Sequence, residues 1–355
     1  MARRILRGIL PRKVRGALTM LVPFVIDADS IAPDPSWSPA QILVCHEALL
    51  SIWSHIGLLL LDGGAQEEAL LYRELDRLPP KPRGRWIDTL KYMPILFMGS
   101  DWDGKVRPDR LRVIAGRASV ALVEDAHAEV SFGLAEDELS TTGAATEGIE
   151  ICRLAAAAQA ARFSEALTLS KRPIEIGETF RDIWIQRFRR LAAAPIKQVC
   201  IVDRYAVGQH FAPGRSYDSG LARFFHLLDE DACGDRYITL YSAWTPEIKD
   251  KDISDVEREL RFILKNCSRG RIKRATVYML PNAVFGKMSH DRFIRFGDRH
   301  GWDLGLGLKI LEGAFCSEKS RTTFKTGVDI DSYRETEDAL RKDPQVKSVI
   351  VKGSP

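Results

Sequence analysis

Residues 21–27 read LVPFVID, a short run of apolar, β-forming side chains that ends in a carboxylate. Such a run is typical of a buried strand. Residues 119–125 read SVALVED and repeat the pattern, again with acids at the end. Between these two strands the sequence predicts helices and one more strand, at 39–57, 58–64, 65–78, 85–93 and 109–118. This alternation of strands and helices predicts a parallel α/β sheet.

A second α/β region begins at residues 197–205, KQVCIVDRY, a strand that is followed by helices and further strands. Residues 135–148 are polar and small, which is typical of a domain boundary. The chain has 355 residues, enough for two domains of about 150 residues each. We therefore expect an α/β protein with an acidic-site domain at 18–138, a helical linker at 139–196 and a second domain at 197–355.

The formal net charge is only +4, which permits contact with a polyanion without demanding it. Six arginines and lysines precede residue 16 with no acid among them, at positions 3, 4, 7, 12, 13 and 15. This arm is compatible with phosphate contacts, with a transit peptide or with a solvated basic terminus. A second basic cluster, Arg269, Arg271, Lys273 and Arg274, lies late in the chain.

The six cysteines are scattered without a C-x-x-C pair, a spacing that argues against a zinc module or a disulfide framework. Cys45 and Cys200 stand in apolar stretches, where a buried and reduced thiol fits best. No apolar run approaches the roughly 18 residues that a membrane span needs. We therefore expect a cytoplasmic protein without a membrane span.

Carboxylates follow the predicted strands and open the predicted helices of the first half. They are Asp27, Asp29, Asp62, Glu67, Glu68, Asp109, Glu124 and Asp125. The carboxyl ends of parallel strands gather at one edge of a sheet, and oxygen ligands that converge there suit a divalent cation. One metal ion, or two roughly 3.5–4 Å apart, can activate water against a phosphodiester. Acids at helix starts and after strands also arise from the helix dipole and from turn chemistry alone.

Two segments of the first half resemble PIN-like nucleases: VIDAD (25–29) and PDRLRVIAGRASVALVED (108–125). The resemblance covers about residues 20–135 and implies that Asp27, Asp109 and Asp125 bind Mg²⁺ or Mn²⁺. Glu67 or Glu68 would complete the catalytic set, because only one of these neighbours can face the strand ends. The family's hydroxyl residue before the final acid is replaced here by Glu124.

Residues 289–311, SHDRFIRFGDRHGWDLGLGLKIL, resemble the phospholipase-D-like domain that follows microtubule-interacting-and-trafficking (MIT) helices. The shared features are a His-Asp-Arg, a Gly-Trp and a Gly-x-Gly-Leu, and IVDRY (201–205) matches an earlier strand. The resemblance covers about residues 150–355 and implies a ligand-binding set. That set is His290, Asp291, Arg292, Arg295, Trp302 and Asp203.

Catalysis by a phospholipase D needs an H-x-K-x4-D pattern, usually twice, and this chain has one partial copy. His290 and Arg292 are present, but the next fitting acid is Asp298. The resembling domain is non-catalytic and binds lipid head groups or partners. Arginines present a planar donor fork suited to phosphate, so we expect an anionic ligand or a protein partner here. The alternative is an internal polar network beneath the Gly-x-Gly turn, with Trp302 in the core.

Other polar and aromatic residues are better explained by packing. His46 and His55 lie on one apolar helix but on different faces, so we expect packed or surface side chains. Tyr205, Trp244 and Tyr278 have rings that can stack on bases, with core packing as the default.

Together these patterns predict a metal-dependent endonuclease, with RNA favoured over DNA, joined to a non-catalytic phospholipase-D-like sensing or recruitment domain. The resemblances suit a microbial defence or toxin system. A non-enzymatic module that binds an anion or a protein through residues 290–299 is the alternative. A phosphodiesterase centred on His290 is a third hypothesis.

Overall fold

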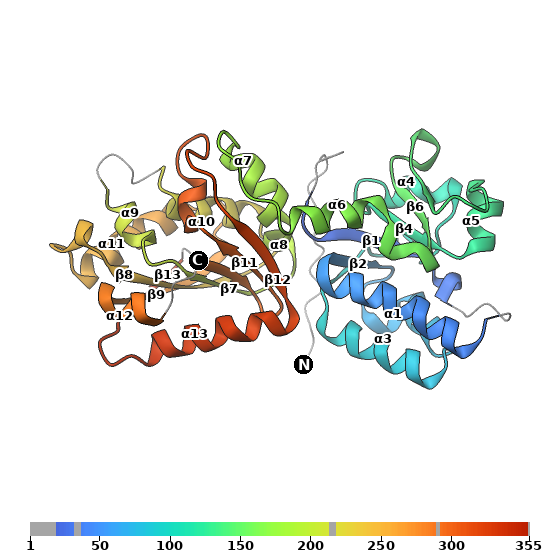
Figure 1. Cartoon of the computed structure of the whole chain (residues 1–355), viewed down its shortest axis with the longest axis horizontal. Coiled ribbons are helices and arrows are strands. Elements are labelled where there is room, and N and C mark those ends of the chain that lie inside the picture. The colour runs from blue at the N-terminus through green and yellow to red at the C-terminus, as the bar shows by residue number, and fades with distance from the viewer. Residues whose placement is uncertain (1–18, 32–36, 213–217, 289–291, 354–355) are drawn as a thin grey trace. The chain divides into compact units, whose positions relative to one another are not determined.

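The computed structural model describes residues 19–31, 37–212, 218–288 and 292–353 (Figure 1). The chain divides into two compact units, residues 1–169 and 170–355. Each unit is built on its own sheet with helices, which confirms the predicted α/β class. Among the described helices, none is long and apolar enough to cross a membrane.

The N-terminal unit has a six-stranded sheet in the order β3-β2-β1-β4-β6-β5. All neighbouring strands are parallel except β5 and β6. The strands are β1 (Val22–Ile26), β2 (Gly57–Leu61), β3 (Ile95–Phe97), β4 (Val120–Val123), β5 (Ser140–Thr141) and β6 (Glu150–Arg153). The sheet is therefore the parallel sheet that the alternating pattern predicts.

Helices α1 and α3 lie side by side in this unit (Figure 1). The α-helices are α1 (Pro39–Ile56), α2 (Leu70–Leu75), α3 (Pro80–Tyr92), α4 (Leu111–Ile114), α5 (Asp125–Phe132) and α6 (Ala161–Leu169). Short 3-10 segments are η1 (Ala28–Ile31), η2 (Gln66–Glu68), η3 (Pro108–Arg110), η4 (Ala144–Thr146) and η5 (Leu154–Gln159). A core of aromatic rings joins α1, α3 and α6 to β1: the Phe24 ring centre lies 6.2 Å from that of Trp53 and 5.6 Å from that of Phe163, and Trp86 packs on Trp53.

The C-terminal unit has a seven-stranded mixed sheet in the order β12-β11-β10-β7-β8-β9-β13. Strands β7, β8 and β9 are parallel, whereas β10 to β13 pair with their neighbours in antiparallel fashion. The strands are β7 (Gln198–Val202), β8 (Arg236–Trp244), β9 (Ile272–Pro281), β10 (Phe293–Phe296), β11 (His300–Leu304), β12 (Thr322–Thr326) and β13 (Lys347–Lys352). Pairing therefore changes from parallel to antiparallel at two places, between β7 and β10 and between β9 and β13.

The helices of this unit pack on both sides of the sheet. Alternate residues of a strand point to opposite faces, so the sheet contributes to two separate cores. The helices are α7 (Phe180–Ile183), α8 (Arg189–Ala193), α9 (Ala206–His210), α10 (Gly220–Asp231), α11 (Ile253–Lys265), α12 (Asn282–Met288) and α13 (Asp331–Lys342). A π-helical turn, η6 (Trp184–Phe188), joins α7 to α8, and η7 (Pro246–Ile248), η8 (Gly307–Leu311) and η9 (Gly327–Ile330) are 3-10 segments. One core holds Phe188, Phe224 and Trp302, and the other holds Tyr241, Phe293 and Tyr333.

The boundary between the units lies at residues 169 and 170, later than the polar stretch 135–148. Strand β6 pairs in parallel with β4, so residues 150–153 belong to the first sheet. Helices α7 and α8 belong to the C-terminal unit, where Trp184 packs on Phe224 at 5.6 Å between ring centres. The expected helical linker at 139–196 is therefore divided between the two units.

Candidate functional site

The strand order of the N-terminal sheet reverses between β1 and β4, and the carboxyl ends of these two strands lie side by side. From β1 the chain first adds β2 and β3 on one side, and then β4 and β6 on the other. Ligands of open α/β sheets bind at such a point, outside the carboxyl ends of the strands. Asp27 follows β1 directly there, and Glu124 follows β4. Asp62 follows β2, three residues after Leu59, which is in register with Phe24 of β1.

Asp27 is buried, with 4% of its surface exposed, and both of its carboxylate oxygens have partners. Oδ1 accepts a hydrogen bond from the backbone N–H of Val106 at 2.8 Å. Oδ2 accepts one from the hydroxyl of Ser30 at 3.0 Å. The Ser30 hydroxyl also accepts the N–H of Glu124 at 2.8 Å. Ser30 therefore ties the end of β1 to the end of β4 and fixes the orientation of Asp27.

The segment 99–107, here called the edge loop, crosses the same carboxyl edge. The N–H of Ala28 donates to the carbonyl of Gly104 at 3.1 Å. Trp102 and Val106 of this loop are buried. The carbonyl of Val106 lies 2.6 Å from Nε2 of His127 on α5. The edge loop thus reaches from β3 to α5, and it accounts for the burial of Asp27.

Asp62 is buried as well, but its carboxylate accepts a hydrogen bond from the first residue of helix α2. Both oxygens accept the N–H of Leu70, at 3.2 and 2.9 Å. Burial raises the pKa of Asp62, while the hydrogen bond from Leu70 acts in the opposite direction. The helix expected over 65–78 begins only at Leu70, because Asp62 satisfies the first N–H of α2.

Glu67 and Glu68, the candidates for a fourth ligand, lie on η2 rather than at a helix start, and both are exposed. The carboxylate of Glu68 accepts the N–H of Gly64 at 2.9 Å, so it closes the turn after β2. Asp109 lies on η3 and is exposed to solvent. The expected helix over 109–118 is shorter, because only 111–114 are α-helical.

Asp125 is the first residue of α5, next to the end of β4. Its Oδ1 lies 3.4 Å from Nη1 of Arg153, a buried residue of β6. Nη2 of the same guanidinium lies 3.3 Å from Glu129. Arg153 therefore offsets the charge of two acids on α5, and Asp125 faces this cation.

The expected Mg²⁺ or Mn²⁺ site calls for the carboxylates of Asp27, Asp109 and Asp125 to converge at one point. Across the described residues, no three His, Cys, Asp or Glu side chains lie together as a group that can hold a metal ion. Asp27 is bonded to Val106 and Ser30, and Asp125 faces Arg153. As placed, these side chains do not fit a divalent cation. The structure brings the acids after β1, β2 and β4 to one edge, but it does not gather the predicted ligand set.

Two residues of this site escaped the prediction from sequence. Ser30 follows Asp27 by only three residues, within reach of a local hydrogen bond, so local chemistry could have indicated it. His127 contacts the edge loop through Val106, a partner 21 residues away. That contact depends on the path of the loop, for which the sequence carries no local signal.

In the C-terminal unit Asp203 follows β7 and is buried, with 2% of its surface exposed. Its carboxylate accepts the N–H of Leu308 at 2.7 Å and that of Tyr205 at 3.0 Å. Burial raises the pKa of Asp203, while the hydrogen bonds from Leu308 and Tyr205 act in the opposite direction. Gly307 has φ +58° and a Cβ there would stand 2.1 Å from Oδ2 of Asp203. Asp203 therefore holds the Gly-x-Gly turn and has a structural role rather than the ligand-binding role expected of it.

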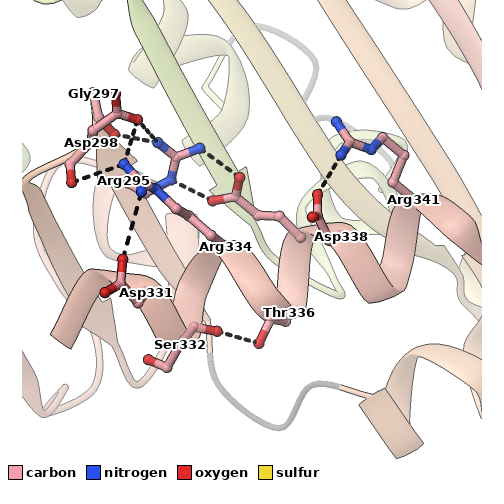
Figure 2. A network of polar contacts seen from close by, with 10 residues as sticks. Arg295, Gly297, Asp298, Asp331, Ser332, Arg334, Thr336, Asp338 and Arg341 are labelled. Carbon is pink, nitrogen blue, oxygen red and sulfur yellow. Dashed lines mark hydrogen bonds and ion pairs between the residues drawn. The ribbon is translucent and has the colours of Figure 1, made fainter. Parts of the chain in front are cut away.

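Arg295 also has a structural role, in a network of polar contacts (Figure 2), and Trp302 has one in the core. The guanidinium of Arg295 forms two hydrogen bonds of 2.6 Å to Glu337 on α13, and a third to the carbonyl of Gly297. Burial acts to lower the pKa of Arg295, but the carboxylate of Glu337 acts in the opposite direction, and the pKa is raised above its ordinary value. Trp302 is buried, and its indole N–H donates to the carbonyl of Arg187 at 3.1 Å. Neither side chain is available to a ligand, which corrects two expected binding residues.

His290 and Asp291 lie outside the described residues. Arg292 is described and half-buried, and its guanidinium carbon lies 5.5 Å from the ring centre of Tyr205. Tyr278, another of the three rings considered for base stacking, is stacked on Tyr241, with 4.9 Å between the ring centres. Of the expected ligand-binding set in the described chain, Arg292 alone remains a candidate.

The histidines and cysteines with a predicted packing role lie as expected. His46 is buried and accepts the indole N–H of Trp86 at Nδ1, 2.9 Å away, whereas His55 is exposed. Cys45 and Cys200 are buried and not bonded to another cysteine. Burial raises the pKa of Cys45 to about 11, so its thiol is protonated at neutral pH.

Comparisons with known proteins add no relative: no protein-family model matches the chain, and no curated protein matches it. The resemblances to PIN-like nucleases and to phospholipase-D-like domains therefore stay predictions.

Proposed function

We propose that the N-terminal unit is a nuclease that cleaves phosphodiester bonds, with RNA favoured over DNA, at the carboxyl ends of β1 and β4. One observation carries the proposal: Asp27 lies at the point where the strand order reverses, with its carboxylate oriented by Ser30 and Val106. The resemblance of residues 25–29 and 108–125 to PIN-like nucleases supports it. Asp27 is the residue that we assign to catalysis, and Ser30 is a positioning residue.

The requirement for Mg²⁺ or Mn²⁺ is a separate part of the proposal, because the side chains as placed do not enclose a cation. We derive no catalytic step through a metal ion. We also propose a cytosolic location, which the six unpaired cysteines support because disulfides are rare there.

The test uses the full chain with labelled single-stranded RNA and DNA of the same sequence, in Mn²⁺, in Mg²⁺ and in EDTA. We expect cleavage by the parent protein and its loss, by about 100-fold or more, in Asp27→Asn, as for other removed catalytic groups. Asp88→Asn removes an exposed carboxylate from α3 and should cleave like the parent. Cleavage that persists in EDTA would refute the metal requirement alone.

Thermal unfolding of both variants shows whether Asp27→Asn remains folded, because the mutation alters two buried hydrogen bonds. Ser30→Ala provides a second variant that keeps the carboxylate and loses one partner, so we expect partial loss of activity. Equal cleavage by the parent and a folded Asp27→Asn, or no cleavage by either, would exclude the nuclease.

A further inference from the structure

One face of the C-terminal sheet is only partly covered by helices. Helix α13 packs over the middle of β7 and the later part of β8, where Leu340 lies in one core with Cys200 and Tyr241. Tyr237, near the start of β8, and Arg274 of β9 are not part of that core. Tyr237 is half-buried and Arg274 is exposed. The first half of these strands therefore presents side chains to solvent.

Strand pairing places four side chains in one row across this uncovered part, here called the open row. Strands β7, β8, β9 and β13 are neighbours in the sheet (Figure 1). Gln198 of β7 pairs with Tyr237 of β8, which pairs with Arg274 of β9. Arg274 in turn pairs with Lys352 of β13. Paired residues point to the same face, and neighbouring strands lie about 4.8 Å apart, so the four side chains are close neighbours.

A second row lies two residues further along the same strands. Thr239 of β8 pairs with Thr276 of β9, which pairs with Ile350 of β13. Both threonines are half-buried, and Ile350 is 56% exposed. The uncovered face thus combines hydroxyl groups and one apolar side chain with the cations and the ring of the open row.

The charge of the open row is positive. The guanidinium carbon of Arg274 lies 5.4 Å from the ring centre of Tyr237, and Lys352 is exposed beside them. Strands β7, β8, β9 and β13 contain no aspartate or glutamate. The acid next to the row in the sequence is Asp235, which precedes β8. The surface therefore favours a negatively charged partner.

The ring distinguishes between classes of polyanion. An acidic protein surface calls for cations alone, whereas here an aromatic ring lies within the basic row. Unpaired bases stack on aromatic rings and on guanidinium planes, and the phosphates between them are attracted to neighbouring cations. A duplex has its bases stacked inside, so it offers the row only phosphates. A single exposed isoleucine among threonines gives little apolar area for insertion into a membrane.

We propose that the open row binds a single-stranded nucleic acid. A base stacks on Tyr237 and Arg274, and the adjoining phosphates contact Arg274 and Lys352. The threonines of the second row offer hydroxyl groups to the neighbouring base or sugar. The proposal does not rest on the nuclease, because it uses residues of the other unit and its test measures binding without cleavage.

Fluorescence anisotropy of labelled oligouridylate with the full chain, in EDTA and at several salt concentrations, tests the site. A gel confirms that the label stays on intact RNA. We expect Arg274→Ala and Lys352→Ala to bind several-fold more weakly, and each to reduce the slope of log affinity against log salt by about 0.7, the loss of one phosphate contact. Lys249→Ala removes an exposed cation beyond the other end of β8 and should bind like the parent.

Tyr237 has a different signature, because stacking does not depend on salt. Tyr237→Leu should bind about 5-fold or more weakly, the lower end of what a stacked base contributes, with an unchanged salt slope. Tyr237→Phe keeps the ring and should bind like the parent. Thermal unfolding shows that the variants remain folded. Oligodeoxyuridylate in place of the RNA shows whether the sugar contributes to recognition.

Three results would overturn the site. One is binding of oligouridylate that is absent in the parent or unchanged in folded Arg274→Ala and Tyr237→Leu. Another is an RNA duplex that binds as tightly as the single strand. The third is sedimentation with phosphatidylcholine vesicles containing 10% phosphatidylserine, without binding to oligouridylate, which would assign the surface to a membrane instead.

Discussion

Buried carboxylates in this protein mainly accept hydrogen bonds from backbone N–H groups. Asp229 is fully buried and accepts from Arg269 and Arg271 at 2.7 and 2.5 Å. Asp62 and Asp203 do the same for a helix start and for a glycine turn. An unpaired buried N–H is costly, so these acids stabilise the loops that they hold. The same types of residue in a sequence also suggest metal ligands, and only their partners distinguish the two roles.

His46 gives the clearest pH dependence at this scale. Burial lowers the pKa of His46 to about 4, and its Nδ1 accepts from Trp86. Because the pKa in the folded state lies below the ordinary value near 6.5, protonation favours the unfolded chain. The contribution to stability is complete above pH about 6.5 and is lost as the pH falls toward 4, by about 1.4 kcal/mol per pH unit.

We therefore predict that His46→Gln reduces the pH dependence of unfolding between pH 6.5 and 4 by about that slope. Glutamine keeps an acceptor for Trp86 but does not titrate. Urea unfolding at several pH values, followed by tryptophan fluorescence, measures the slope. His55→Gln, at an exposed position of the same helix, should leave it unchanged. The same slope in His46→Gln and in the parent would contradict the prediction.

Helix boundaries follow the partners of the first N–H groups. Helix α2 begins where Asp62 accepts a hydrogen bond from Leu70, not at the acids of η2. The sequence predicts a helix at 85–93, whereas helix α3 already begins at Pro80. This is possible because proline is tolerated at the first helical position.

Helix α11 allows a test of capping by mutation. Asp252 accepts the N–H groups of Ser254 and Asp255 at 2.8 and 3.0 Å, and the Asp255 carboxylate accepts the N–H of Asp252. We predict that Asp252→Ala lowers the free energy of unfolding by about 1 kcal/mol. Asp250→Ala, an exposed change two residues earlier, is the control and should cost less than half as much. Urea unfolding measures both, and equal stabilities would contradict the prediction.

Over the whole molecule, each unit is a separate sheet with its own core. The C-terminal core includes residues that precede its first strand: Trp184 and Phe188 are buried against Phe224 and Trp302. Loss of a buried aromatic side chain typically costs about 3–5 kcal/mol, and whole domains are stable by only about 5–15 kcal/mol.

We therefore predict that residues 170–355 fold when expressed alone, whereas residues 197–355 do not. Circular dichroism during heating should show a cooperative transition for the longer fragment and none for the shorter one. A cooperative transition in the fragment 197–355 would show that α7 and α8 are dispensable for this core.

The sequence by itself determined the α/β class, the strands at 21–27, 119–125 and 197–205, and the burial of Cys45 and Cys200. These features follow from local runs of apolar side chains, whose period is readable without the fold. The sequence missed β3, which has only three residues, and α5, whose start coincides with the acids that were assigned to the end of a strand.

Only the tertiary structure decided what the polar residues do. Asp27 meets Val106, 79 residues away, and Arg295 meets Glu337, 42 residues away. Tyr205 and Arg292 are neighbours because β7 and β10 pair. A hydrogen bond or an ion pair depends on distance and direction in space, and residue type alone sets neither. The apolar pattern thus predicted the sheets, whereas the partners of each charged group depended on how distant segments pack.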